Sequence, residues 1–402
     1  MGGIAVPRCD APELSVVLVT YNAWEWTERA LQALTATTES PYELVVVDNA
    51  SSDETRTHLA SLAGARVVYE DLNRGFGAAA NLGVMISRAP RVLLLNSDAM
   101  VQPGWLPPLR EVLDGEDDVA AVGARLDNLD GTLQEAGSMV WGDGAGDNYG
   151  DGDDPRRPEY RFRRDVDYLS AACLLVRRSA FLDAGGFDPV YHPAYYEDTD
   201  LAMRWRSVGM RVVYQPRSVA VHKRWASSGD RSGMLPQLLR NRPIFVERWK
   251  ELIGLRPPRP NPDDPASLLA IRDAECVERL LVVASRAEDA RDVAGALGTV
   301  APSWRITLLC WDDDGEGDVA ESLRAGGVEV VGARGVDVEA WLRFRRHHHS
   351  AVLHVGEVPQ RIRELLRETQ AQASWIDAGD LATPDAAGRV AAFVERWDLR
   401  LP

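Results

Sequence analysis

Short apolar runs without apolar/polar alternation recur in the first hundred residues, and they constrain the fold most strongly. Leu14–Val19, Leu44–Val47 and Val92–Leu95 read LSVVLV, LVVV and VLLL. Strands that are buried on both faces have this composition, and such strands form parallel sheets covered by helices. Trp24–Thr35 and Phe76–Ser87 separate the runs and have the apolar spacing of helices. The alternation of strands and helices predicts a doubly wound α/β domain.

Small polar or acidic residues directly follow these apolar runs. They are Thr20, Tyr21 and Asn22 after the first run, Asp48 after the second, and Asn96, Ser97 and Asp98 after the last. Asn, Ser and Asp are also preferred N-caps, so each group alone fits the start of the next helix. Because parallel strands bind ligands at their carboxyl ends, three such strand ends together favour a shared site.

A glycine-containing segment, NRGFGAAANLG at 73–83, joins the short strand Val67–Glu70 to a helix. Gly75 and Gly77 allow close backbone approach at a helix N-terminus, where free N–H groups favour an anion. Tight packing of the helix against the sheet would explain the same two glycines.

Three carboxylates lie within four residues at the start of another predicted helix, in the stretch YYEDTDL at 195–201. Acidic residues in a first helical turn are favourable because of the helix dipole, which is a sufficient structural explanation. Crowding among Glu197, Asp198 and Asp200 would also raise one pKa and produce a better general base.

The chain divides at a proline-rich stretch. Residues 256–265 contain five prolines, which cannot occupy a helix interior or a central strand, so we expect a semi-rigid linker. Residues 1–255 form the first predicted domain. Residues 266–402 again alternate apolar runs with helical patterns and predict a second, smaller Rossmann-like α/β domain. We expect its three consecutive histidines, residues 347–349, to form a surface run.

Composition excludes several classes of protein. There is no apolar run of about 18 residues and no basic flank with an apolar stretch at the N-terminus. The four cysteines are far apart and match no metal spacing. A net charge of −16 disfavours nucleic acid as a partner. We therefore expect a cytoplasmic bacterial protein with reduced thiols.

Seven stretches, in this order and spacing, resemble the family 2 glycosyltransferases of bacteria, which have the GT-A fold. They are VVLVTYN (16–22), VVVDNASSDET (45–55), NRGFGAAANLG (73–83), LLLNSDAMVQPGW (93–105), FLDAGGFDP (181–189), YYEDTDLAMRWRSVGMRVVY (195–214) and VAVHKR (219–224). The similarity is greatest to the rhamnosyltransferase-like enzymes of surface-polysaccharide assembly.

The resemblance implies a divalent cation, Mg²⁺ or Mn²⁺, held by Asp98. The Asp-X-Asp motif of the family reads Asn96-Ser97-Asp98 here, so its first carboxylate is replaced by an amide. Mg²⁺ needs few protein ligands when phosphate oxygens supply the others. His222, after the predicted strand Ser218–Val221, is the second implied metal ligand.

The resemblance also assigns the general base to Asp198 rather than Glu197 and implies direct attack with inversion at the anomeric carbon. Asp48 is implied to accept the N3–H of uracil or thymine. The remaining implied nucleotide-sugar contacts are Thr20, Tyr21, Asn22, Asn73, Arg74, Gly75, Asn81, Asn96, Ser97, Asp98, Glu197 and Arg242. Arg242 belongs to the basic stretch 223–245, which fits a solvated linker equally well.

The resulting prediction is an inverting, metal-assisted transfer of one sugar from a UDP- or dTDP-sugar to a glycan or small-molecule hydroxyl. A sugar nucleotidyltransferase is the alternative enzyme, and a non-catalytic nucleotide-sugar-binding scaffold is the alternative of another class. A lipid-linked acceptor would add a peripheral membrane contact. The sequence leaves a homo-oligomer open.

Overall fold

The computed structural model describes residues 4–6, 9–224, 234–259, 269, 272–273, 275–301, 303–377 and 390–394. It forms two compact units. Unit 1 comprises residues 1–155 and 164–259, and unit 2 comprises residues 156–163 and 260–402. Residues 225–233 of the basic stretch and residues 260–265 of the predicted linker lie outside the described residues.

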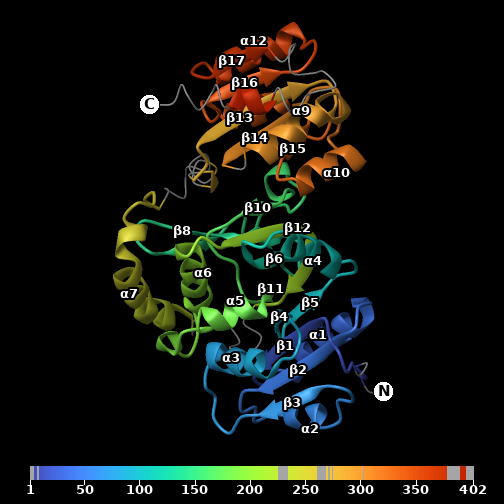
Figure 1. The fold of residues 1–402 in the computed structure, drawn as a ribbon, viewed down its shortest axis with the longest axis vertical. Coiled ribbons are helices and arrows are strands. Elements are labelled where there is room, and N and C mark those ends of the chain that lie inside the picture. Colours follow the sequence, from blue (N-terminus) through green and yellow to red (C-terminus); the bar gives the residue numbers. More distant parts are fainter. Residues whose placement is uncertain are drawn as a thin grey trace. The chain divides into compact units, whose positions relative to one another are not determined.

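Unit 1 is built on a ten-stranded mixed sheet with the strand order β10-β12-β6-β11-β4-β1-β2-β3 (Figure 1). Two further strands join this sheet, since β5 pairs with β12 and β7 pairs with β6. A separate hairpin is formed by β8 and β9. The strands are β1 (Leu14–Thr20), β2 (Tyr42–Asp48), β3 (Arg66–Tyr69), β4 (Arg91–Asn96), β5 (Ala99–Val101), β6 (Val119–Asp127), β7 (Leu133–Glu135), β8 (Ser138–Val140), β9 (Gly146–Asn148), β10 (Arg164–Asp165), β11 (Cys173–Arg177) and β12 (Arg211–His222).

Helices connect the strands of unit 1. They are α1 (Trp24–Thr37), α2 (Thr55–Leu59), α3 (Phe76–Ile86), α4 (Leu106–Gly115), α5 (Arg178–Asp183), α6 (Glu197–Ser207), α7 (Met234–Ile253) and the 3₁₀ turn Pro189–Tyr191. The strands and helices predicted over the first hundred residues are confirmed, with ends that differ by at most two residues.

The two faces of the sheet are covered by different helices, as the uninterrupted apolar runs predict. Val16 and Leu18 of β1 belong to one buried cluster with residues of α1 and α4. The intervening residue, Val17, faces α3, where a Cβ on Gly83 would lie 2.3 Å from a methyl carbon of Val17. Gly83 therefore permits close packing of α3 on the sheet, because successive strand residues point to opposite faces.

Long-range pairing completes the sheet beyond β4. The antiparallel strand β11 lies between β4 and β6, and β12 runs parallel to β6. The short strand β5 pairs with the end of β12, so that His222 lies opposite Ala99. This pairing brings the two predicted metal-binding segments to the same edge of the sheet.

Unit 2 has a five-stranded parallel sheet in the order β15-β14-β13-β16-β17. Its elements are β13 (Glu278–Ala284), α9 (Ala287–Val300), β14 (Trp304–Cys310), α10 (Asp318–Ala325), β15 (Glu329–Gly332), α11 (Val338–Phe344), β16 (Ala351–His354), α12 (Gln360–Thr369), β17 (Ser374–Asp377) and, from the earlier segment, the 3₁₀ turn Pro158–Tyr160. One face packs on α9 and α10, and the other on α11 and α12. This is a doubly wound α/β arrangement.

Buried charges within unit 2 hold residues 156–163 and the histidine run. Arg345 bonds Glu159 at 3.1 Å and Glu329 at 2.7 Å, and the buried ring of Phe162 lies under two arginines. The expectation of a surface histidine run is wrong in part. His347 is exposed, whereas His348 contacts the buried Asp273 and His349 is buried against Gln370. The reason is long-range packing, which the local sequence does not reveal.

Within the ranges that the structure describes, none of the helices combines the length and the apolar character needed to cross a membrane.

Candidate active site

The carboxyl edge of the unit 1 sheet gathers the polar strand ends predicted from the sequence. Thr20 lies opposite Asp48 in the pairing of β1 with β2, and Asn96 lies opposite Val19 in the pairing of β1 with β4. His222 ends β12 at the same edge. The sheet pairing thus brings to one edge residues that lie about 200 positions apart in the sequence.

Asp98 and His222 form the predicted metal-binding pair. The Nε2 atom of His222 lies 3.1 Å from Oδ1 of Asp98 and 3.4 Å from Nδ2 of Asn96. Both Asp98 and His222 are buried. Among the described residues there is no cluster of three His, Cys, Asp or Glu side chains that could hold a metal. A cation here would therefore need ligands from a substrate as well.

Gln134 on β7 sets the orientation of His222. Its amide nitrogen donates to the carbonyl of His222 and to Oδ1 of Asn128, both at 2.9 Å. Its amide oxygen therefore faces Nδ1 of His222, at 2.6 Å, and accepts a hydrogen bond from Nδ1–H. In the neutral ring, Nε2 then carries the lone pair, and it lies 3.1 Å from Oδ1 of Asp98. Two electron-pair donors at this separation fit a divalent cation, and an oriented histidine of this kind is typical of metal sites.

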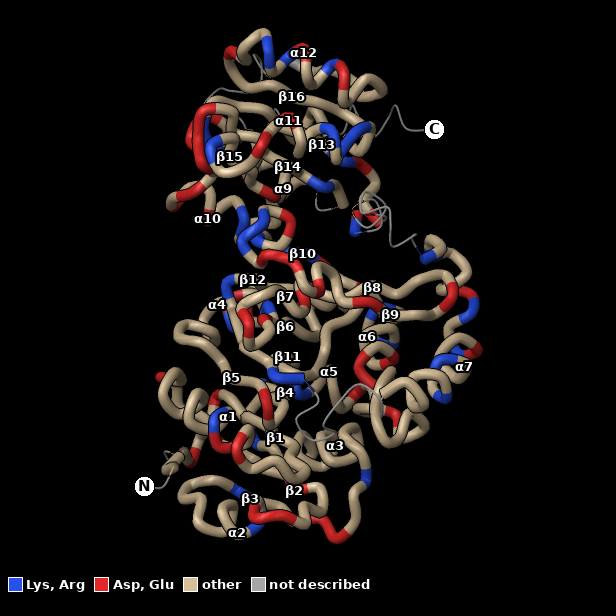
Figure 2. Tube along the Cα trace, turned by 180° about the vertical axis from the view of Figure 1, so that it is seen from behind, with Lys and Arg blue, Asp and Glu red and all other residues tan. Residues whose placement is uncertain are grey.

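The predicted base residues begin α6 after two strained residues. Tyr195 and Tyr196 have φ values of 73° and 75°. The half-buried Asp198 accepts hydrogen bonds from the backbone N–H of Thr199 at 2.7 Å and from the N–H of Ala171. Burial raises the pKa of Asp198, although these N–H groups lower it. Figure 2 shows the acidic residues at the start of α6.

Glu197 and Asp200 have different surroundings from Asp198. Glu197 is buried, and burial followed by the nearby charge of Asp198 raises its pKa well above the usual range. Asp200 is fully buried and bonds Arg204 at 2.8 Å and Arg248 at 2.9 Å. Asp200 is therefore paired with two arginines, whereas the bonds of Asp198 are with backbone N–H groups and with Thr199.

Glu135 on β7 is a buried carboxyl group near Asp198 that the sequence did not single out. One oxygen accepts the backbone N–H of Ser170 at 3.1 Å, next to the Ala171 N–H that bonds Asp198. Burial raises the pKa of Glu135 to about 7, and the charge of Asp198 adds to this rise. Neither Glu135 nor its neighbour Gln134 belongs to a motif in the sequence, so no sequence signal marks Glu135 as a site residue.

The nucleotide-binding residues predicted after β1 and β2 lie side by side. Asp48 is fully buried and accepts hydrogen bonds from Arg56 at 2.6 Å and from the backbone N–H of Ser51 at 3.2 Å. Asn22 bridges to the same loop through Ser51 and Ser52. The hydroxyl of Thr20 faces that of Thr27 at 2.8 Å, and Tyr21 is half-buried beside it. Arg56 is a partner of Asp48 that the sequence did not predict.

The loop at 73–75 is held by Asn49, a residue of the second polar strand end for which the sequence predicted no separate role. The amide of Asn49 donates to Oδ1 of Asn73 at 3.0 Å and accepts the backbone N–H of Arg74 at 2.9 Å. Gly75 has a φ of 79°, and a Cβ there would lie 2.5 Å from the carbonyl oxygen of Pro193. The close approach explains this glycine. The exposed guanidinium of Arg74 bonds Glu70 at 2.6 Å.

Two residues that were predicted to contact the donor, Asn81 and Arg242, bond other parts of the protein. Asn81 exchanges two hydrogen bonds of 2.8 Å with the backbone of Phe187, and so joins α3 to the loop before α6. Arg242 bonds the carbonyl of Asp143 at 2.9 Å and its carboxylate at 2.6 Å. Donor binding by Asn81 and Arg242 stays a prediction.

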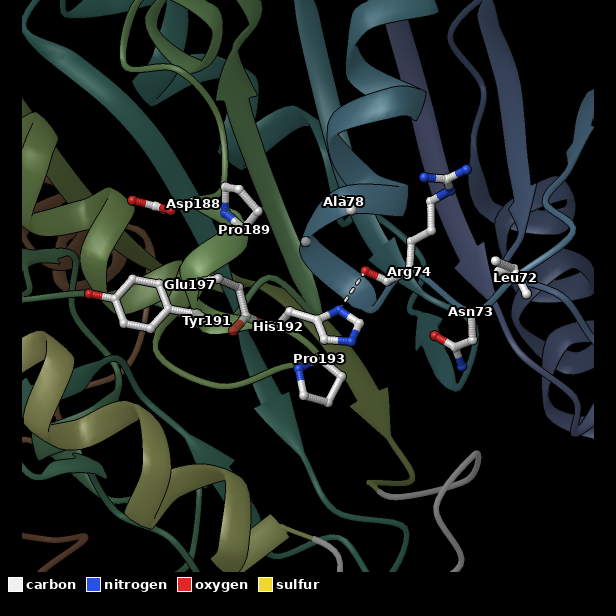
Figure 3. Close-up of a pocket in the computed structure, with 11 residues that line it drawn as sticks. Leu72, Asn73, Arg74, Ala78, Asp188, Pro189, Tyr191, His192, Pro193 and Glu197 are labelled. Carbon is white, nitrogen blue, oxygen red and sulfur yellow. Dashed lines mark hydrogen bonds between the residues drawn. The ribbon is translucent and has the colours of Figure 1, made fainter.

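A pocket of about 440 Å³ lies between the N-terminus of α3 and the segment before α6 (Figure 3). Glu197 lines it, together with Leu72, Asn73, Arg74, Gly77, Ala78, Asp188, Pro189, Tyr191, His192 and Pro193. Nδ1 of His192 lies 2.9 Å from the carbonyl oxygen of Arg74 across the pocket mouth. The pocket thus adjoins both the glycine loop and the acidic start of α6.

Backbone strain is concentrated at this edge of the sheet. Among the described residues, those other than glycine with positive φ are Asn22, Ala23, Ala50, Tyr195, Tyr196, Arg224 and His347. All but His347 lie in the loops that carry the residues above. Such conformations cost about 1–3 kcal/mol each and gather at functional sites.

Comparison with known proteins agrees with this geometry. The profile described as Glycosyl transferase family 2 matches residues 15–183. N-acetylglucosaminyl-diphospho-decaprenol L-rhamnosyltransferase of Mycobacterium tuberculosis is 32% identical over 244 residues, covering 54% of this chain and 78% of that protein. The O-antigen biosynthesis protein RfbC of Myxococcus xanthus is 26% identical over 269 residues, covering 63% and 20% respectively.

Among solved structures, GalNAc-T7 with UDP, GalNAc and Mn²⁺ aligns with a TM-score of 0.50 and 15% identity, covering 61% of this chain and 49% of that one. Identity this low shows the fold alone, and it confirms the predicted GT-A fold. Together with the family profile and a relative that is covered over more than two thirds of its length, the alignment leads to one conclusion: the chain belongs to glycosyltransferase family 2, as a rhamnosyltransferase-like enzyme.

Proposed function

We propose that this glycosyltransferase moves one sugar from a UDP- or dTDP-sugar to a hydroxyl group of a glycan or small-molecule acceptor, with inversion at the anomeric carbon. One observation carries the proposal. A single loop contacts both halves of the site, since Ala171 donates its N–H to Asp198 and the carbonyl of Ala172 accepts the N–H of Asn96. The general base and the end of β4, which leads to Asp98, are therefore held next to each other.

The donor would be held by the strand ends. Asp48 and Asn22 lie where the base and ribose would bind, and Asn49 orders the backbone of residues 73–75 beside them. Asp98 and His222 would hold a Mg²⁺ or Mn²⁺ ion. When bound, the ion supplies positive charge that stabilises the departing nucleoside diphosphate. GalNAc-T7 was solved with UDP and Mn²⁺, which supports a divalent cation in general.

Asp198 would remove the acceptor proton as the acceptor oxygen attacks the anomeric carbon. The bond from that carbon to the phosphate oxygen breaks with its electron pair on the diphosphate. No protein nucleophile intervenes, so the configuration inverts. Burial raises the pKa of Asp198, which makes its carboxylate a stronger base than an exposed aspartate.

The relative from Mycobacterium tuberculosis is named for rhamnosyl transfer to N-acetylglucosaminyl-diphospho-decaprenol. This supports a lipid-linked sugar as the first acceptor to test and dTDP-rhamnose as one of the first donors. With such an acceptor the enzyme would act at a membrane surface.

Ligand binding tests the donor class. We expect one UDP- or dTDP-sugar, with Mn²⁺, to raise the melting temperature by roughly 5–10 °C at about 100 times its dissociation constant. EDTA should remove most of this shift, and a GDP-sugar should give little. A melting temperature unmoved by every UDP- and dTDP-sugar would contradict the proposal.

The role of Gln134 gives a second test. Gln134→Leu removes the acceptor of Nδ1–H, so His222 no longer presents Nε2 to Asp98. Loss of such a partner typically weakens metal affinity about 10–100-fold. Mn²⁺ binding in the presence of UDP, followed by electron paramagnetic resonance, measures this effect without turnover. Gln215→Leu is the matched control, since Gln215 is a buried glutamine of β12 that bonds Pro108 instead. Equal Mn²⁺ affinity in the two variants would contradict the proposal that Gln134 orients His222 for metal binding.

A further inference from the structure

The short strand β7 contributes to both halves of the site. Successive side chains of a strand point to opposite faces. Gln134 faces His222, and Glu135 faces the loop that holds Asp198. Two consecutive residues of one strand therefore contact His222 on one side and the loop that bonds Asp198 on the other.

The burial of the Glu135 carboxyl group is energetically unfavourable, and a purely structural role does not explain it. Its exposed fraction is 1%, and Oε2 has no hydrogen-bond partner within the described part of the chain. Oε1 accepts the Ser170 N–H, and the Ser138 hydroxyl lies beside the same carboxyl. A glutamine would fill the same space without a buried charge, so the carboxylate calls for a reason other than packing.

Several charged and titratable groups act on Glu135 or respond to its charge. Asp198 opposes its ionisation from α6, and Arg224 after β12 favours it. The buried phenols of Tyr168 and Tyr214 face it, and burial raises the pKa of both. The charge of Asp198 also adds to the rise that burial causes in the pKa of Glu197. Asp198 is the carboxylate whose charge opposes the ionisation of Glu135, and the two carboxyl groups accept hydrogen bonds from consecutive backbone N–H groups, those of Ala171 and Ser170.

We propose that Glu135 is a positioning residue of the active site, whose carboxyl group faces Asp198 and controls the ionisation of Asp198 when the acceptor hydroxyl arrives. The inference rests on the proposed function of Asp198. Repulsion between the two carboxylates is relieved as Asp198 takes the acceptor proton. Glu135 thereby strengthens Asp198 as a base without touching the substrate.

The pH dependence of transfer tests the proposal. In Glu135→Gln the amide oxygen still accepts the Ser170 N–H, but the negative charge is gone. Because the pKa of Glu135 is about 7, we expect the wild-type kcat/KM to rise as Glu135 ionises near that pH, and we expect Glu135→Gln to lack this rise. At pH 8 the rate should fall about 2–10-fold, because Asp198 is then a weaker base. The assay uses UDP- and dTDP-sugars with a short-chain N-acetylglucosaminyl-diphospho-prenol as the acceptor.

Thermal stability gives a second readout that needs no substrate. The pKa of Glu135 is about 7 in the folded protein and ordinarily 4.5. Between these values the native state binds more protons than the unfolded state, so the contribution of Glu135 to stability falls as the pH rises. Glu135→Gln should therefore melt above the wild type at pH 8 and lose this advantage near pH 4.5. A structural glutamate would give a variant that melts lower at both pH values.

Glu43→Gln is the matched control. It also removes a buried carboxylate from unit 1, but Glu43 lies near the start of β2 and is paired with Arg88. Its pH profile for transfer should match that of the wild type. If Glu135→Gln does not fold, Glu135→Asp, which withdraws the charge by one methylene, should show a smaller rise of kcat/KM near pH 7 than the wild type.

Two results would overturn the inference: a pH profile of Glu135→Gln that superimposes on that of the wild type, or a uniform loss of rate that leaves the rise near pH 7 in place. Each requires a wild type that transfers sugar and depends on Asp198, so the proposed function survives either result. A wild type that transfers sugar from none of the donors would instead defeat the proposed function, and the inference would fall with it.

Discussion

Asp198→Asn is expected to lower the rate of sugar transfer by at least about 100-fold, and by up to about 10⁴-fold, while the affinity for the donor stays unchanged. The acceptor hydroxyl is a very weak acid, so its proton must leave as the new bond forms. Asparagine keeps the size of Asp198 and its bonds from Thr199 and Ala171, but it cannot accept that proton. Donor binding involves no proton transfer and should not change. Steady-state transfer rates and donor affinity by calorimetry measure the two effects separately.

The neighbouring carboxylates provide the controls for Asp198→Asn. Glu197→Gln should retain more transfer activity, although Glu197 lines the pocket. Asp200→Asn should mainly lower stability, by roughly 3–5 kcal/mol, because it breaks a buried network with Arg204 and Arg248. Near wild-type transfer in Asp198→Asn, together with loss of transfer in Glu197→Gln, would identify Glu197 as the general base instead. A collapse of donor affinity in Asp198→Asn would make Asp198 a donor-binding residue.

Asp98→Ala is expected to remove transfer, with a loss of at least about 10³-fold, together with metal-dependent nucleotide binding. The charge of the leaving diphosphate would then face His222 alone. The fold should remain, since the backbone bond from Lys223 N–H to the carbonyl of Asp98 does not involve the side chain. Circular dichroism checks the fold, and UDP binding with and without Mn²⁺ checks the site.

Asp127→Ala is the control for Asp98→Ala. Asp127 ends β6, next to β12, but its carboxylate is paired with Arg125 at 2.9 Å. Asp127→Ala should leave the Mn²⁺-dependent binding of UDP unchanged. Full transfer activity of the wild type in excess EDTA would contradict the metal assignment of Asp98 and His222.

The sequence predicts the parallel part of the fold well because its determinants are local. The runs that became β1, β2 and β4 are apolar on both faces, and each ends in the polar residues that form the site. Parallel register then requires Thr20, Asp48 and Asn96 to share an edge. Asp98 and His222 could be paired only through the family resemblance, since β5 and β12 are joined by a contact across more than 100 residues.

The residues that the sequence analysis missed depend on such long-range contacts. Gln134 and Glu135 belong to a three-residue strand whose composition carries no local signal. Asn49 directly follows Asp48 in the sequence, and nothing local indicates that its side chain bonds Asn73 in another loop. Residues 156–163 join unit 2 through Glu159 and Phe162, which no feature of the surrounding loop predicts. Side chains that act by positioning others are visible only in the folded structure.

The anomeric configuration of the product tests the central claim most directly. The wild-type enzyme, with Mn²⁺, each UDP- or dTDP-sugar and a short-chain N-acetylglucosaminyl-diphospho-prenol, would be followed by NMR. The account predicts one nucleoside diphosphate released per new glycosidic bond, and a bond whose configuration is opposite to that of the donor. A product that keeps the donor configuration, or release of pyrophosphate in place of a nucleoside diphosphate, would contradict it.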